Sequence, residues 1–213
     1  MAGFGEEDLT SGRVLVFESG AVVRITHACE ICSALRKFVD AATYRALVGE
    51  RGALGVVVRD GAILRGGRVV LDDHARFPVV PDAMASRAAW VLGQVPAGNV
   101  LTYDILLRLI GGKRAYVRAL PAYVKRAEAA GLPGHRVLTS RGTLTGHVAY
   151  QKERLAREGT SVDDSERIID RYRAWFGRDL YTTPISDIGM SAALDAPILP
   201  GRVSRHNVEI ALT

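Results

Sequence analysis

A chain of 213 residues has room for one large domain or two small ones, and 48% hydrophobic with 24% charged residues is typical of a globular protein and excludes a largely disordered one. The net charge is +5, from 28 Lys and Arg against 23 Asp and Glu. No apolar run approaches the roughly 20 residues of a membrane span, and Glu6 and Glu7 stand where a signal peptide carries positive charge, so we expect a cytoplasmic protein without membrane contact.

The first strands are predicted from two short, alternating, β-branched runs. Residues 13–17 and 21–26 flank Glu18, Ser19 and Gly20, which predicts a β-hairpin. Helical spacing follows from about 32 to 48. Strand patterns return at 54–58 and 63–71, with Asp60 and Gly61 as the turn between them. These elements predict a small N-terminal antiparallel sheet with a helix.

Two cysteines, Cys29 and Cys32, are too few for a disulfide framework, and one C-x-x-C is half of a four-ligand zinc site. His27 would supply a third ligand, but no second cluster follows, so we interpret the pair as structural and expect no metal and no cofactor. The 24 Arg against 4 Lys and the scarcity of Asn and Gln fit a thermophilic source or a high genomic GC content. A thermophilic source would leave open a disulfide between Cys29 and Cys32.

Prolines at 78 and 81 place a linker near 73–82 and end a first domain at 1–80. From Asp82 the pattern is helical as far as Pro96. Thr102 is an N-cap for a helix over 103–110, which Gly111 and Gly112 stop.

A second helix is expected from about Lys113 to Gly131, which makes a helix-turn-helix. Pro121 inside it costs about 3 kcal/mol outside a first turn, so this helix is either kinked or begins later. Residues 136–138 and 143–145 flank a turn at 140–142 and predict the wing of a winged-helix domain.

The last elements are two further helices. One is expected over 150–157 and closes a domain at 82–159; the other runs from Ser165 to Phe176 in an extension over 160–213, which carries no motif. The fold class is therefore α+β: the N-terminal sheet with its helix, a winged-helix (helix-turn-helix) domain that binds DNA, and a C-terminal extension.

Positive charge is concentrated in one segment. Residues 99–159 hold 11 Lys and Arg and 4 Asp and Glu, a net +7, whereas residues 1–98 hold 11 of each. A localised basic segment between neutral and acidic sequence is typical of a module that binds a polyanion. The alternative is a solvated protein surface.

Several motifs in this basic segment occur in an order that resembles the alkylguanine-DNA alkyltransferases. They are Val95-Pro96-Ala97-Gly98-Asn99-Val100-Leu101-Thr102-Tyr103, Val117-Arg118-Ala119-Leu120, Pro133-Gly134-His135-Arg136-Val137, Arg141-Gly142-x-Leu144-x-Gly146 and Arg157-Glu158-Gly159. The resemblance covers roughly 91–159, about a third of the chain. It implies double-stranded DNA with a modified base as the partner, bound by a monomer that works with downstream excision-repair proteins in the cytoplasm, or at the nucleoid of a prokaryote.

The resemblance also implies roles for individual residues. The second helix would lie in the minor groove, with Arg118 entering the base stack in place of an extruded nucleotide. Tyr103 takes the position of a pocket tyrosine. Phosphate contacts would come from four further cations, Lys113, Arg114, Lys125 and Arg126.

Members of this family accept the alkyl group on the cysteine of a Pro-Cys-His-Arg motif, and here that position is Gly134. Glycine has no nucleophile, so transfer to this residue is impossible. His135 and Glu158 remain, and in the family they form a hydrogen-bonded pair. The missing side chain would free volume for a larger adduct.

The loop that closes the pocket also departs from the family. His147-Val148-Ala149-Tyr150 replaces its glycine-rich segment, and Lys125-Arg126-Ala127-Glu128 stands where an asparagine is usual. We expect the base pocket to be lined by Gly134, His135, His147, Val148 and Tyr103.

Three functions fit these residues. The first is a damage reader that flips and binds an alkylated base without alkyl transfer. The second is a glycosylase-like or nuclease-like repair enzyme in which His135 and Glu158, with Asp104 as a second carboxylate, activate a water. The third is an interaction protein whose working part is the extension at 160–213.

Overall fold

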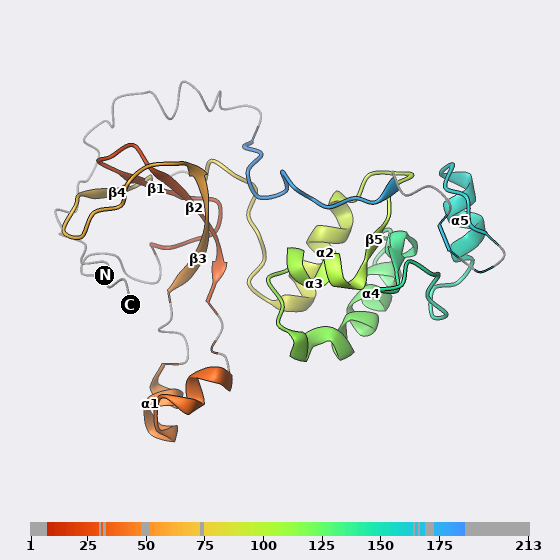
Figure 1. Ribbon diagram of the computed structural model, residues 1–213, viewed down its shortest axis with the longest axis horizontal. Coiled ribbons are helices and arrows are strands. Elements are labelled where there is room, and N and C mark those ends of the chain that lie inside the picture. Colours follow the sequence, from red (N-terminus) through yellow and green to blue (C-terminus); the bar gives the residue numbers. More distant parts are fainter. Residues whose placement is uncertain are drawn as a thin grey trace. The chain divides into compact units, whose positions relative to one another are not determined.

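The computed structural model describes residues 8–29, 31, 33–47, 52–72, 75–163, 165, 167–168 and 173–185. The chain forms two compact units, one of residues 1–80 with 181–213 and one of residues 81–180 (Figure 1). Residues 160–180 therefore cluster with the second unit and not with the residues that follow them.

Unit 1 is built on a four-stranded antiparallel sheet in the order β3-β2-β1-β4. The predicted hairpin is present: β1 (Val14–Phe17) pairs with β2 (Val22–Ala28), and Val16 lies opposite Val22. Gly20 has a φ of +87° in the turn, a conformation that favours glycine. The mixed α/β character expected from the sequence is confirmed by this sheet and the helices around it.

The other two strands do not form the expected second hairpin. β3 (Ala53–Arg59) pairs with β2, and β4 (Val69–Leu71) pairs with β1, so they occupy opposite edges of the sheet. β1 and β2 each have two neighbours, and their residues Val14, Val22 and Ile25 are almost fully buried. The Asp60-Gly61 turn therefore leads into a crossing connection, because the central hairpin takes a partner on each side.

The helical segment between β2 and β3 consists of two short pieces. A 3-10 turn, η1 (Ser33–Lys37), is followed by α1 (Ala41–Ala46). Asp40 caps α1, because its carboxylate accepts hydrogen bonds from the backbone N–H groups of Ala42 and Thr43 at 2.8 and 2.9 Å. Cys32 lies outside the described residues, and with it the question of a disulfide to Cys29.

Arg24 links the sheet of unit 1 to two segments outside it, at Pro78 and Tyr181. It is fully buried on β2 and donates hydrogen bonds to the carbonyls of Pro78 at 2.6 Å and Tyr181 at 2.5 Å. Its guanidinium lies 4.9 Å from the ring centroid of Phe77, and burial lowers the pKa of Arg24 to about 10.

Unit 2 begins with the predicted helices. α2 (Met84–Gln94) is followed by β5 (Leu101–Thr102) and α3 (Tyr103–Leu109), and the hydroxyl of Thr102 caps α3 by accepting from the N–H of Ile105. These elements and the next helix, which lie together in Figure 1, share a core whose most buried members are Ala88, Val91, Leu92, Leu106, Ile110, Leu120, Val124 and Val137. The elements that carry the candidate functional site pack on this core.

The predicted second helix begins later than Lys113. A 3-10 segment, η2 (Arg114–Ala119), precedes α4 (Leu120–Ala129), and Pro121 lies in the first turn of α4. Proline is tolerated there because the N–H groups in the first turn of a helix have no carbonyl partner within the helix. Arg118 therefore lies in a tight turn that leads into α4, and not within the helix.

The turn predicted at 140–142 is present, because the N–H of Thr139 donates to the carbonyl of Thr143 at 2.9 Å. On either side of it, β6 (Val137–Leu138) pairs in parallel with β5 and Thr143 forms a bridge with Arg167. The helix expected over 165–176 is wrong at its described residues, because Ile168 bridges Val162 and Ala174 pairs with Val100. α5 (Gln151–Arg157) forms as expected.

Candidate functional site

The Gly134-His135-Arg136 segment is a single 3-10 turn, η3 (Gly134–Arg136), which leads directly into β6. Gly134 and His135 are buried. Because β6 pairs with β5, residue 137 lies opposite Leu101 and the turn is brought beside the start of α3. The packing of β5 and β6 thus places Gly134, His135 and Tyr103 in one region of unit 2.

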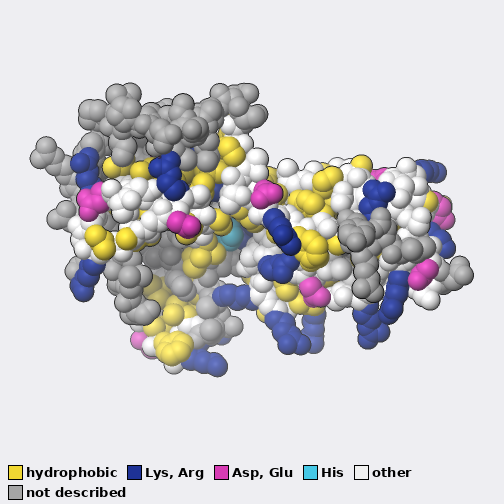
Figure 2. All heavy atoms as spheres, turned by 45° about the horizontal axis from the view of Figure 1, so that its top comes forward, with side chains coloured by type: hydrophobic (Ala, Val, Ile, Leu, Met, Phe, Trp, Pro, Cys, Tyr) yellow, Lys and Arg dark blue, Asp and Glu magenta, His cyan; other side chains and the backbone are white. Residues whose placement is uncertain are grey.

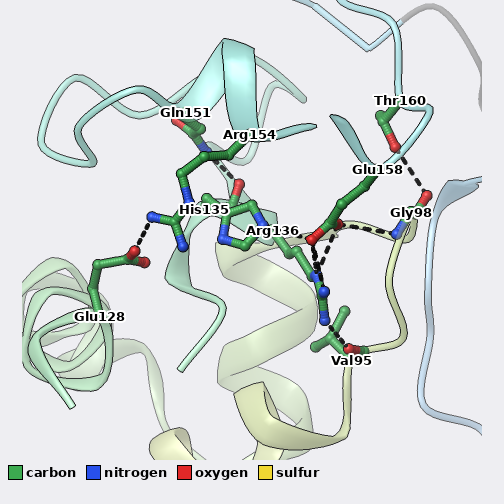
Figure 3. Close-up of polar contacts among 9 residues, drawn as sticks. All are labelled: Val95, Gly98, Glu128, His135, Arg136, Gln151, Arg154, Glu158 and Thr160. Atoms are coloured by element: carbon green, nitrogen blue, oxygen red, sulfur yellow. Dashed lines mark hydrogen bonds and ion pairs between the residues drawn. The ribbon is translucent and has the colours of Figure 1, made fainter. Parts of the chain in front are cut away.

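Glu158 is the anchor of this turn. Its carboxylate accepts a hydrogen bond from Nε2 of His135 at 2.8 Å, two bonds from Arg136 at 2.7 and 2.9 Å, and one from the N–H of Gly98 at 3.0 Å (Figure 3). Burial raises the pKa of Glu158, but the hydrogen bonds from Arg136, Gly98 and His135 outweigh it and hold that pKa at about 2. The pairing of His135 with Glu158 implied by the resemblance is present, and Arg136 is the stronger partner that sequence reasoning missed.

The carboxylate of Glu158 orients the ring of His135. An ionised carboxylate can only accept, so Nε2 of His135 carries a proton and donates it to this hydrogen bond. Nδ1 is buried and has no hydrogen-bond partner among the described residues. Glu158 itself is fully engaged and has little affinity for a proton, which suits an anchor better than a general base.

Gln151 links Thr145, in the loop that precedes α5, to the turn that contains His135. Its side-chain amide donates to the carbonyls of His135 and Val137 at 2.9 and 2.7 Å and accepts from the N–H and hydroxyl of Thr145 at 2.6 and 3.0 Å. All four hydrogen bonds of the amide are thus made in a buried position. A lone glutamine at the start of a helix gives no sequence signal for this role.

The space beside Gly134 is not empty, which corrects the expectation of freed volume. The carboxylate of Glu128, from α4, reaches into it, and its Oε2 would overlap a Cβ at residue 134. The Cβ of Glu128 and Cγ1 of Val124 would each lie 3.2 Å from that atom. Arg154, from α5, forms an ion pair with Oε1 of Glu128 (Figure 3). The side chain of Glu128 therefore occupies the space that a side chain at residue 134 would take.

Tyr103 and His147 form a second pair in the predicted pocket. The Tyr103 hydroxyl lies 2.9 Å from Nε2 of His147, and the two rings stack with centroids 6.3 Å apart. Burial raises the pKa of Tyr103 to about 12, whereas burial and the charge of Lys125 lower the pKa of His147. Tyr103 therefore keeps its proton, and a hydrogen bond joins its hydroxyl to Nε2 of His147. Val148 is 7% exposed and packs in the core of unit 2.

The four predicted phosphate ligands and Arg118 lie on the surface of the segment from Lys113 through α4. Lys113, Arg114, Arg118, Lys125 and Arg126 are all exposed. Figure 2 shows Lys and Arg side chains projecting along one edge of unit 2. Asp104 is exposed in the first turn of α3, and no hydrogen bond or ion pair within the described part of the chain joins it to His135 or Glu158.

Among the described residues, no group of three or more His, Cys, Asp and Glu side chains is placed to hold a metal ion. None of the helices formed by these residues has the length and apolar character needed to cross a membrane.

Comparison with known proteins gives matches to the region that carries this site. The family model for the DNA-binding domain of 6-O-methylguanine DNA methyltransferase matches residues 83–160. The DNA base-flipping proteins of Escherichia coli K12 and Shigella flexneri are each 36% identical over 97 residues, which cover 43% of this chain and 74% of theirs. The chain belongs to the 6-O-methylguanine DNA methyltransferase family. It is an alkyltransferase-like member of that family, since Gly134 stands in place of the acceptor cysteine.

Two solved structures are also similar to this region. S. pombe Atl1 in complex with damaged DNA containing O6-carboxymethylguanine has 24% identity and a TM-score of 0.38, over 43% of this chain and 94% of that one. S. pombe ATL in complex with DNA has 26% identity and a TM-score of 0.36, over 43% and 93% of the two chains.

Proposed function

We propose that this protein recognises DNA damage by flipping an alkylated or otherwise modified base out of the duplex and binding it without alkyl transfer, as a step in DNA repair. The observation that carries the proposal is that Gly134 has lost the acceptor while the surrounding anchor of His135, Arg136 and Glu158 is intact. The relatives named DNA base-flipping protein, 36% identical over this region, support the same function.

The DNA-binding surface is proposed to be a helix-turn-helix of α3 and η2–α4, within a winged-helix domain. Arg118 is exposed in the 3-10 segment that leads into α4, so its side chain can enter the stack beside an extruded nucleotide. Lys113, Arg114, Lys125 and Arg126 contact phosphates and give affinity that depends on salt and not on sequence.

The flipped base is proposed to be held near Gly134, His135, Tyr103, His147 and Val148. The hydrogen bond between Tyr103 and His147 fixes two aromatic rings in this region, and flat rings of this kind stack on bases. Downstream excision-repair proteins would then act on the marked lesion, in the cytoplasm or at the nucleoid of a prokaryote, with the reader bound as a monomer.

The test compares duplexes that contain O6-methylguanine or guanine at one position, with binding measured across salt concentrations. We expect tighter binding to O6-methylguanine, an unchanged protein mass after incubation, and a loss of about tenfold in affinity for Arg118→Ala. Arg65→Ala, which removes an exposed arginine of unit 1, is the matched control. Equal affinity for the two duplexes, or a protein that gains the mass of a methyl group, contradicts the proposal.

The enzymatic alternative is tested on the same samples. Nδ1 of His135 is buried without a partner among the described residues, but the carboxylate of Glu158 is already bound by Arg136. Base release or strand cleavage that is lost in His135→Ala would favour the enzyme over the reader.

A further inference from the structure

A carboxylate oxygen without a hydrogen-bond partner lies beside Gly134 and points to a ligand that can donate. Oε2 of Glu128 is buried and has no partner among the described residues, and the same holds for Nδ1 of His135, the residue that follows Gly134. Arg154 pairs with Oε1 of Glu128, and Nε2 of His135 bonds to Glu158. In the view of Figure 3, Glu128 and Glu158 lie on opposite sides of His135.

The geometry explains why Oε2 of Glu128 is available. Arg154 bonds to Oε1 and so orients the carboxylate, while the absence of a side chain at Gly134 lets Oε2 approach the backbone. A residue with a Cβ at position 134 would displace that oxygen. The position of the Glu128 carboxylate therefore depends on glycine at residue 134.

Buried acceptors distinguish among the groups that could be placed against them. An apolar substituent would leave the carboxylate oxygen without a hydrogen bond, and an acidic substituent would be repelled. An amino group satisfies the acceptor with a charge-assisted hydrogen bond. The carboxylate beside Gly134 thus favours a hydrogen-bond donor, whereas the thiol of an acceptor cysteine reacts with an electrophilic carbon.

We propose that Glu128, with His135, is a lesion-selecting residue that favours a flipped base whose substituent carries an N–H donor. This inference rests on the proposed function, because it assumes that a flipped base reaches Gly134. It assigns to this member a preference among lesions: amino-bearing adducts first, neutral alkyl adducts next and acidic adducts last.

Three duplexes of nearly equal adduct size test the preference. They contain O6-(2-aminoethyl)guanine, O6-propylguanine and O6-carboxymethylguanine, and the dissociation constant of each is compared with that of the unmodified duplex. We expect the aminoethyl duplex to bind about tenfold more tightly than the propyl duplex, with the carboxymethyl duplex weakest of the three. In Glu128→Gln, which keeps the size of the side chain, the ratio should fall to within about threefold.

Glu153→Gln, an exposed change on α5, is the matched control and should leave the ratio unchanged. Gly134→Ala is a second variant, which should reduce the ratio by displacing the Glu128 carboxylate. An equal ratio in the native protein and both site variants, or a preference for the propyl adduct, overturns the inference. Failure of the proposed function looks different, because then no modified duplex binds more tightly than the unmodified one.

Discussion

The carboxylate of Glu128 occupies the space that a side chain at residue 134 would take if that residue were not glycine. The two residues lie six apart in the sequence, on α4 and η3, and neither position alone indicates the contact. The loss of the acceptor cysteine has therefore changed the chemistry of the pocket wall instead of leaving a vacancy.

Restoring the cysteine alone should not restore an ordinary site. Gly134→Cys should lower the free energy of unfolding by about 1–3 kcal/mol, since its Cβ overlaps Glu128 and approaches Val124 closely. Adding Glu128→Ala should recover part of that loss, so the double-mutant cycle is strongly non-additive. Chemical denaturation of the two single variants and the double variant measures this, and simple additivity would show that the side chains do not meet.

Stability should depend on pH through Glu158. Its folded-state pKa of about 2 lies below the ordinary 4.5, so its contribution is present above about pH 5 and is lost as the pH falls towards 2. With solvent screening the shift corresponds to about 1–2 kcal/mol, and Glu158→Gln should flatten the acid limb of the stability curve. Glu153→Gln, on the exposed side of α5, is the control. An acid limb that is unchanged in Glu158→Gln would contradict this assignment.

The protonation of His147 should respond to Lys125. Burial and the nearby positive charge lower the pKa of His147, so its imidazole should titrate below 6.5 in NMR spectra of the free protein. Lys125→Gln should raise the midpoint, whereas Lys113→Gln should not. A midpoint that stays the same in Lys125→Gln would remove the electrostatic cause.

Gln151 should be far more important to stability than the other glutamine of the chain. Gln151→Leu leaves a buried N–H, a hydroxyl and two carbonyls without their partner, which costs about 2–4 kcal/mol. A loss of that size lowers Tm by roughly 10 °C or more in a domain of this size. Gln94→Leu, at the exposed end of α2, should leave Tm nearly unchanged. Equal effects of the two changes would contradict the described hydrogen-bond network.

Local signals predicted the helices of unit 2 well, because their determinants are close in sequence. Thr102 caps α3, and Pro121 marks the first turn of α4, as one of the two alternatives for that proline required. The motif around His135 identified the family because its members keep the same order of residues. These signals sufficed to locate the site.

Contacts between distant residues were not predicted. β3 and β4 flank a central hairpin instead of pairing with each other, and Ala174 pairs with Val100 where a helix was expected. Glu128 was treated as a departure from the family pattern, and its meeting with Gly134 and Arg154 requires the packing of α4, η3 and α5. Sequence periodicity reports which face of an element is buried but not which partner covers it.

Base flipping itself is tested most directly by fluorescence. A 2-aminopurine placed beside O6-methylguanine in a duplex brightens when its neighbour leaves the stack, and anisotropy of the same duplex reports binding. The protein should raise the 2-aminopurine emission as it saturates the duplex, and Arg118→Ala should bind at higher concentration without that rise. Saturation by the native protein with no change in emission would contradict the conclusion that it flips the damaged base.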